Sequence, residues 1–426
     1  MKASKYNYFV PLKENIVIYN GLTDCFFEIP LQRAELYRTI INNPNNYLAD
    51  FSDFFKKLEA GGFVIADDVE EKTKVREKYK LLSRPNQYYL MILPTYQCNL
   101  RCWYCIQDHA NVFMSNDVIN RVKKLITRKL NSGKITEFHL SWFGGEPLMA
   151  YDTLLELTKF AQSMAQDNNI RFSSSITTNG TLLTSKRIKE LREAGVKHYQ
   201  ITIDGDPETH DSVKELKGAS AYAMTMTHVN EIAEQNAVSL RFNYTKENLK
   251  PKGIVEGIKR FISPQSRKNI TFVIHKVWQE DEKFISEEEI DELIKLSNAE
   301  NISHDLVAHG FCYTDYADFD CIFPNGRVGK CDNHQLSDFP GILERDGNIK
   351  WEKPVEAFYN YHVFSGKGGE CEECKYLPVC WGPCAVKREK MIEEQECITC
   401  LYGSERDREL SKNIIQLVKT KKKVIK

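Results

Sequence analysis

The 426-residue sequence predicts an α/β protein: a partial (β/α)6 barrel between a small N-terminal α+β domain and a cysteine-rich C-terminal domain. Strand and helix patterns alternate from about residue 88 to about residue 299, which indicates βαβ units and a parallel sheet. About six such units are found, fewer than the eight of a closed barrel. Nine of the 13 cysteines fall between positions 312 and 400, beyond the last of these units.

The N-terminal part has the pattern of a small α+β domain. Strands are expected at 6–11, 15–20 and 25–29, followed by helical stretches at 31–42 and 47–60 and a short strand at 63–66. Residues 70–82 are so highly charged that we expect a solvated helix or a linker there. We therefore predict domains at 1–87, 88–299 and 300–426.

The barrel region follows a regular order. Alternating apolar residues and helix caps predict strands at 88–95, 138–143, 171–178, 198–204, 239–245 and 270–277, with helices at 116–130, 152–167, 185–194, 222–235 and 255–262 between them. A final helix with a basic end is expected at 403–420.

Composition narrows the class of partners. The 58 Lys and Arg residues balance 59 Asp and Glu, so neither nucleic acid nor an anionic membrane is an expected partner. The first twenty residues lack the apolar segment of a signal peptide, and no stretch approaches the roughly 18 apolar residues of a spanning helix. We expect a cytoplasmic location. Thiols stay reduced there, so the cysteine groups indicate metal ligation rather than disulfides.

Three cysteines follow the first barrel strand. Cys98, Cys102 and Cys105 lie within eight residues, and three thiolates leave one iron of a four-iron cluster open to an external ligand. Their spacing, with Tyr104 before the third cysteine, resembles the signature of the radical S-adenosylmethionine (SAM) superfamily. The resemblance implies a [4Fe–4S] cluster that holds SAM and yields a 5′-deoxyadenosyl radical. A zinc knuckle or a ferredoxin-like fragment has similar spacing.

Motifs after the following strands extend the resemblance. The segment 144–147 resembles the family's GGEP motif, whose acidic side chain would accept from the methionyl amine; an ordinary Gly-Pro turn is the alternative. The end of the third strand resembles the segment that reaches the ribose and methionyl groups, and the next strand ends in the family's S-x-DG pattern. The carboxyl ends of parallel strands share one face, so these motifs should converge. The implied cofactor contacts are Tyr104, Gly144, Gly145, Glu146, Ser175, Thr178, Asn179 and Arg187, with Asp204 a catalytic residue facing the substrate side of the barrel mouth; Arg187 has a solvated helix charge as its alternative.

The C-terminal cysteines resemble a SPASM extension, which binds two auxiliary [4Fe–4S] clusters and would bring the total to three. Their spacing includes a Pro324-Asn325-Gly326 turn. Two zinc ribbons are the alternative. The resemblance implies an inner cluster on Cys312, Cys331 and Cys384 with Cys321 as candidate fourth ligand, and an outer cluster on Cys371, Cys374 and Cys380 completed by Cys397 or Cys400.

The N-terminal segment resembles the winged-helix-like leader-recognition domains of enzymes that mature ribosomal peptides (RiPPs), such as sactipeptide and ranthipeptide synthases. Such a domain can bind a precursor leader by strand addition; a generic cap over the barrel is the alternative. The resemblance implies a peptide maturase that forms a thioether or C–C crosslink and takes electrons from an external flavodoxin- or ferredoxin-type reductant. A formylglycine-generating enzyme of the anaerobic sulfatase-maturating type and a non-catalytic zinc-ribbon protein are the alternatives.

Overall fold

The computed structural model describes residues 1–420 except 108, 278, 281–286, 307–310, 333–340, 353–361, 367 and 396. The chain forms two compact units, one of residues 1–85, 308–316 and 355–426 and the other of residues 86–307 and 317–354. These boundaries differ from the three consecutive domains predicted, which remain a prediction. In particular, residues 317–354 group with the sheet of the second unit, whereas the last cysteines group with the N-terminal residues.

The second unit contains a large mixed sheet. Eleven described strands form it, in the order β12-β11-β10-β9-β8-β7-β6-β13-β14-β15-β16. Neighbours from β12 to β13 are parallel, and those from β13 to β16 are antiparallel. The strands are β6 (Gln87–Ile92), β7 (Glu137–Trp142), β8 (Arg171–Thr178), β9 (Val196–Ile203), β10 (Ala237–Tyr244), β11 (Ile270–Lys276), β12 (Ser303–Leu306), β13 (Asp318–Ile322), β14 (Arg327–Gly329), β15 (Gly341–Leu343) and β16 (Ile349–Trp351).

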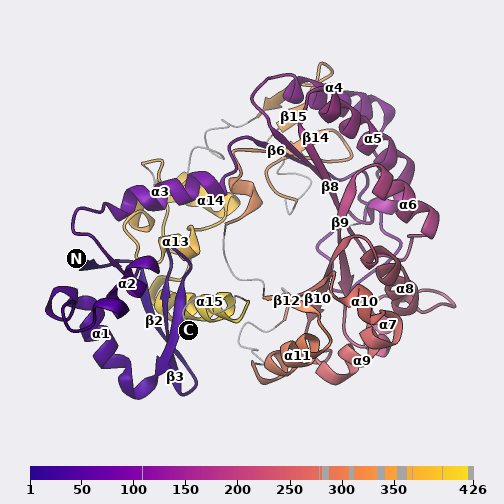
Figure 1. The fold of residues 1–426 in the computed structure, drawn as a ribbon. Helices are drawn as coiled ribbons and strands as arrows, with labels where there is room; N and C mark the ends of the chain where they lie inside the picture. Colours follow the sequence, from indigo (N-terminus) through magenta and orange to yellow (C-terminus); the bar gives the residue numbers. More distant parts are fainter. Residues whose placement is uncertain are drawn as a thin grey trace. The chain divides into compact units, whose positions relative to one another are not determined.

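Helices cover one face of this sheet, as the outer layer in Figure 1 shows. They are α4 (Asn116–Leu130), η3 (Pro147–Ala150), α5 (Tyr151–Asp167), α6 (Ser185–Glu193), α7 (Pro207–Val213), α8 (Ala221–Ala233), α9 (Pro251–Phe261), α10 (Pro264–Arg267) and α11 (Glu287–Ala299). Alternate strand residues such as Phe138, Leu140 and Ile176 pack into the core beneath the helices. The residues between them, such as His139 and Ser175, point to the other face, so that face is polar.

The six predicted barrel strands are all present, and the structure adds two parallel strands. β12 continues the strand–helix alternation past residue 300, where we expected it to end. It is only four residues long, and its pairing with β11, rather than its own pattern, defines it. β13 joins the opposite side of the sheet, parallel to β6. Gly326, with φ of +80°, makes the predicted turn between β13 and β14.

The first unit contains the antiparallel sheet β2-β3-β4, with a separate pair β1-β5. The three predicted N-terminal strands are thus present. The expected helix at 47–60 begins only at Ser52, because Pro44–Asn46 form a 3-10 turn and residues 47–51 are not helical. The elements are β1 (Lys2–Ala3), β2 (Asn7–Leu12), β3 (Asn15–Asn20), β4 (Phe26–Pro30), η1 (Leu31–Arg33), α1 (Ala34–Asn42), η2 (Pro44–Asn46), α2 (Ser52–Ala60), β5 (Val64–Ile65), α3 (Glu71–Leu82), η4 (Tyr313–Asp315), η5 (Gly369–Cys371), α13 (Leu377–Cys380), α14 (Ala385–Gln395), η6 (Gly403–Glu405) and α15 (Arg406–Thr420).

Both ends of the chain contribute to apolar cores in this unit. One face of the β2-β3-β4 sheet packs on α1 and α2, and the other packs on α13 and α15, with Tyr8 and Tyr19 among the contacts. The cysteine-rich part therefore shares an apolar core with the N-terminal strands. The charged segment predicted as a solvated helix or a linker is the helix α3. One face of α3 is apolar, since Val75 and Tyr79 are buried in a further core cluster.

Among the described residues, no helix combines the length and apolar character needed to cross a bilayer.

Candidate functional site

The three-cysteine loop starts at the carboxyl end of β6, and its base is closed by backbone contacts. Thr95 forms an antiparallel bridge with Phe113, and the Thr95 hydroxyl donates to the Val112 carbonyl at 2.8 Å. At the far end of the loop the Cys105 N–H donates to the Cys102 carbonyl at 3.0 Å, which turns the chain between these two thiols. The loop is therefore a defined structure at the sheet edge.

The second motif packs directly against this loop. The Gly145 N–H donates to the Thr95 carbonyl at 3.2 Å, and the Glu146 N–H donates to the Gln97 carbonyl at 2.8 Å. A Cβ on Gly144 would lie 2.5 Å from the Thr95 oxygen, and one on Gly145 would lie 2.6 Å from the Gln97 carbonyl carbon. Glycine at these two positions therefore lets the two backbones meet. The predicted contact of Gly144 and Gly145 with the cofactor stays a prediction.

Glu146 links the second and third motifs. Its carboxylate is buried and accepts from the Leu148 N–H at 3.0 Å, the Thr178 hydroxyl at 2.8 Å and the Asn179 N–H at 2.8 Å. Burial raises the pKa of this carboxyl, while the three hydrogen bonds favour its charged form. A carboxylate has about four acceptor positions, so one remains for a ligand donor such as the predicted amine.

Asn179 connects the third motif to the cysteines. Its side-chain amide donates to Asn99 Oδ1 at 2.9 Å and lies 3.9 Å from the Cys98 sulfur. Asn99 in turn donates to the Thr181 hydroxyl at 2.9 Å. The structure thus brings together Cys98, Glu146, Thr178 and Asn179. Asn99 and Thr181 were not predicted as site residues, because a lone polar residue in a loop gives no signal by itself.

The thiols lie in a partly buried environment with nearby donors. The Leu100 N–H donates to the Cys98 sulfur at 3.4 Å, and His109 Nε2 lies 3.2 Å from the Cys105 sulfur. Burial raises the pKa of all three thiols, that of Cys102 to about 11. The N–H directed at the Cys98 sulfur suits an anionic thiolate that ligates iron, and ligation would displace the thiol protons.

Asp204 directly follows β9 and is fully buried. Its carboxylate pairs with the ammonium of Lys214 at 2.9 Å and accepts from the Tyr104 hydroxyl of the cysteine loop. Its catalytic role toward a substrate stays a prediction. Tyr104, predicted to border the adenine, also accepts from the Asn243 amide at 3.3 Å. These contacts join the cysteine loop to β9 and β10. Lys214 gave no signal in the sequence.

Two further predicted residues lie away from the loop contacts. Ser175 lies on the polar face of β8, where its hydroxyl is 2.9 Å from His139 Nε2 and donates to Ser141 at 3.3 Å. Arg187 lies in the helix layer: its guanidinium donates to the Leu182 carbonyl at 2.6 Å and stands 4.5 Å from the Tyr151 ring centroid. The contact of Arg187 with the cofactor, and its alternative as a solvated helix charge, both stay predictions.

The four cysteines predicted for the inner cluster divide between the two units. In the first unit, burial and the neighbouring Asp315 and Cys384 raise the pKa of Cys312. Asp315 itself forms a buried ion pair with Arg388. In the second unit, burial and neighbouring acidic groups and Cys331 raise the pKa of Cys321. Each pair is thus brought together within its own unit.

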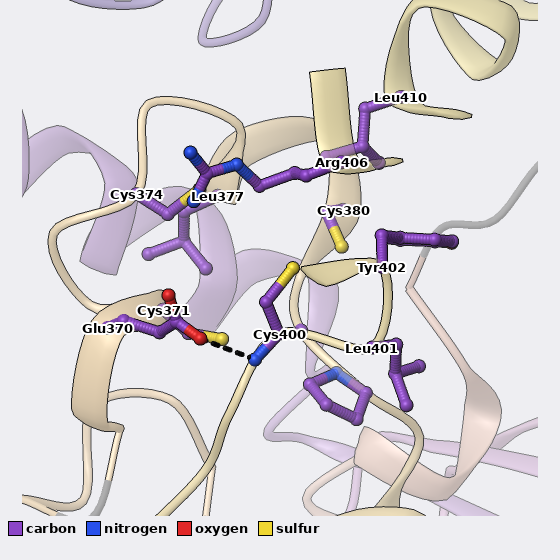
Figure 2. Close-up of a pocket in the computed structure, with 12 residues that line it drawn as sticks. Glu370, Cys371, Cys374, Leu377, Cys380, Cys400, Leu401, Tyr402, Arg406 and Leu410 are labelled. Carbon is purple, nitrogen blue, oxygen red and sulfur yellow. Dashed lines mark hydrogen bonds between the residues drawn. The ribbon is translucent and has the colours of Figure 1, made fainter. Parts of the chain in front are cut away.

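Four of the outer cysteines line one pocket in the first unit, shown in Figure 2. They are Cys371, Cys374, Cys380 and Cys400. Leucines, Tyr402 and Arg406 complete the wall, and the Cys400 N–H donates to Glu370 at 2.7 Å. Burial and the other sulfurs raise the pKa of Cys371 to about 12 and that of Cys380 to about 11.

Cys397 is not among the residues that line this pocket. Among the described residues, no three His, Cys, Asp or Glu side chains form a group that could hold a single metal ion. In a four-iron cluster each thiolate binds a different iron, so the cysteines need not meet at one point. Three thiols in one loop and four around one pocket fit such clusters by number and chemistry.

The fold and the loop define a class: an α/β domain with a three-cysteine site at the carboxyl edge of its parallel strands. Residues 92–237 match the family model of the radical SAM superfamily. This part of the chain is therefore a radical SAM domain.

Similar proteins share mainly this domain. The chain is 31% identical over 156 residues to the Fe-coproporphyrin III synthase of Methanosarcina barkeri, covering 37% of each chain. It is 30% identical over 178 residues to the serine-type anaerobic sulfatase-maturating enzyme of Bacteroides thetaiotaomicron, covering 37% of this chain and 41% of that protein. The chain thus spans less than half the length of these relatives, and their names indicate different substrates.

The fold is similar to a solved structure described as native anSMEcpe with bound AdoMet and Cp18Cys peptide. The TM-score is 0.54 at 18% identity, covering 78% of this chain and 98% of that chain. At this level of identity, the likeness concerns the fold alone.

Proposed function

We propose that this chain is a radical SAM enzyme that modifies a peptide or protein substrate. The observation that carries the proposal is the hydrogen-bonded junction of the cysteine loop with the second and third motifs, through Gly145, Glu146 and Asn179. When bound, a four-iron cluster with SAM supplies the one-electron chemistry that yields a 5′-deoxyadenosyl radical. In this proposal Cys98, Cys102 and Cys105 hold three irons, and Glu146 accepts from the methionyl amine.

Two auxiliary clusters form part of the proposal. The pocket of Cys371, Cys374, Cys380 and Cys400 supports the outer one and favours Cys400 over Cys397 as fourth ligand. The ligands of the inner one stay as predicted from the sequence. A crosslink that joins sulfur to carbon removes a hydrogen atom from carbon, a proton from the thiol and one electron. The hydrogen would leave on 5′-deoxyadenosine, and an auxiliary cluster would take the electron.

The sheet β2-β3-β4 offers a place where a peptide substrate could bind, which favours the peptide proposal. Both its faces are covered, but β4 pairs only with β3 among the described strands, which leaves an edge that an extended leader can join. Leu31, Leu36 and Phe51 in the same part of the chain are exposed apolar side chains that could take leader side chains. Replacing Leu36 or Phe51 by Glu should weaken binding of a precursor encoded beside the gene, without affecting SAM cleavage.

A formylglycine-generating function is the second candidate, because the similarity to the sulfatase-maturating enzyme supports it. The two products differ chemically. Formylglycine is an aldehyde that reacts with a hydrazide probe, whereas a crosslinked peptide does not react and loses a pair of hydrogen atoms. Incubation with the precursor and with a sulfatase-type peptide, followed by mass spectrometry with and without the probe, separates them.

The test of the common activity is anaerobic reconstitution followed by dithionite and SAM. We expect 5′-deoxyadenosine and about twelve iron atoms per chain, with the nucleoside lost in the Cys98→Ala, Cys102→Ala, Cys105→Ala variant. Zinc in place of iron, with no 5′-deoxyadenosine, would refute the enzyme proposal and favour a zinc-ribbon protein.

A further inference from the structure

A buried cation lies beside the cysteine loop, on a residue outside the sequence motifs. Lys214 follows α7 and is 2% exposed. Its ammonium lies 2.9 Å from Asp204 Oδ2 and donates to the Thr202 carbonyl at 2.7 Å. The side chain of Asp204 is only 1% exposed. Such a pair is maintained only when each charge compensates the other, because either one alone would be strongly disfavoured away from water.

Asp204 connects this cation to the loop. While one carboxylate oxygen faces Lys214, the other accepts from the hydroxyl of Tyr104. The backbone of Asp204 is fixed as well: its carbonyl accepts from the Asn248 amide at 3.0 Å, and its N–H donates to His210 Nδ1 at 3.2 Å. The carboxylate is therefore a rigid, charged acceptor, and a hydrogen bond to an ionised acceptor is roughly twice as strong as a neutral one.

Tyr104 lies between two of the cysteines. It immediately follows Trp103 and precedes Cys105, and its carbonyl accepts from the Gln279 amide at 2.9 Å. Its hydroxyl and its backbone are thus both held by the barrel. Tyr104 therefore fixes the segment from Cys102 to Cys105 from within. This contact is separate from the Thr95–Phe113 bridge that closes the base of the loop.

We infer that Lys214 is a positioning residue for the cysteine loop: through Asp204 and Tyr104 it fixes the Cys102–Cys105 segment before any iron is bound. The inference rests on the proposed function only in taking this loop as the iron site. The contacts that fix the loop are present in the chain without metal. Preorganised ligands bind with less loss of conformational entropy, so the same contacts should help the loop to retain iron.

The test is hydrogen exchange of the full-length, metal-free chain, read by mass spectrometry over residues 98–112. Lys214→Met and Tyr104→Phe should each raise exchange in this segment, by about tenfold at the Cys105 amide. Arg267→Met is the matched control. It removes another buried cation of the same unit, paired with Glu300, and should leave the loop unchanged.

A double variant, Lys214→Met with Asp204→Asn, removes both charges and should bring loop exchange closer to wild type than Lys214→Met alone. If Lys214→Met does not fold, Tyr104→Phe decides the question, because it removes a single hydroxyl. Wild-type exchange in Tyr104→Phe would overturn the inference.

Iron retention after reconstitution gives a second readout. Both single variants should lose iron faster than wild type and Arg267→Met when challenged with a chelator. If no protein in the series binds iron but the exchange differences persist, the proposed function fails and the positioning role stands. If iron binds normally and exchange is unchanged, the positioning role fails and the proposed function stands.

Discussion

Gly145→Ala tests the junction between the cysteine loop and the second motif. The added methyl carbon would lie 2.6 Å from the Gln97 carbonyl carbon, and closer still to the carbonyl oxygens of Tyr96 and Gln97. Favourable contacts between carbon atoms begin near 3.5 Å, so the backbones would have to separate by about 1 Å. Both partners are backbone, which cannot rotate away as a flexible side chain can.

The expected cost follows from what that separation breaks. The hydrogen bonds from the Gly145 and Glu146 N–H groups would break, and each loss should lower the free energy of unfolding by about 1 kcal/mol. Residual strain adds about 1–3 kcal/mol. The total of about 3–5 kcal/mol is a large share of the 5–15 kcal/mol that usually stabilises a folded domain.

Calorimetry or urea unfolding of the metal-free chain measures this cost, and iron analysis after reconstitution measures the effect on the site. Gly253→Ala is the matched control, because its methyl would meet only the side chain of Asp206, at 3.1 Å, within helix α9. It should change stability by less than about 1 kcal/mol. If Gly145→Ala unfolds at the wild-type midpoint and retains full iron, the described backbone packing is incorrect.

Three further changes have defined outcomes. Cys400→Ser should remove about a third of the iron after reconstitution, whereas Cys397→Ser should retain it; equal losses would contradict the pocket assignment. Arg388→Met should destabilise the first unit by about 3–5 kcal/mol, because it leaves the buried Asp315 without its partner; an unchanged melting temperature would disprove this. Burial lowers the pKa of His198, so the folded state resists its protonation and stability should fall as pH drops below about 6.5. His198→Gln should flatten this fall in pH-dependent unfolding, and an equally steep fall would exclude His198 as a cause.

Local patterns were sufficient for much of the second unit. Strand–helix alternation predicted all six barrel strands, since each strand has a continuous apolar face and each helix an apolar stripe. It also indicated that the motifs after β6, β7 and β8 meet, because parallel neighbours end at one edge of a sheet. The cysteine spacing alone pointed to the class of domain that residues 92–237 match.

These local patterns did not predict contacts between residues that are distant in sequence. The short strand β12 exists through its pairing with β11, and the charged helix α3 packs through two residues, Val75 and Tyr79, whose burial depends on segments near the other end of the chain. The cysteine-rich part shares an apolar core with β2 and β3 for the same reason.

The sequence by itself determined the six predicted barrel strands with the helices between them, the residue types at the cysteine loop and the chemistry that they allow. Only the tertiary structure decided which partners those residues have: that Gly145 admits a backbone, that Lys214 neutralises Asp204, and that Cys400 rather than Cys397 lines the outer pocket. The physical reason is that periodicity and capping act over a few residues, whereas burial of charge and approach of backbones depend on segments brought together by folding.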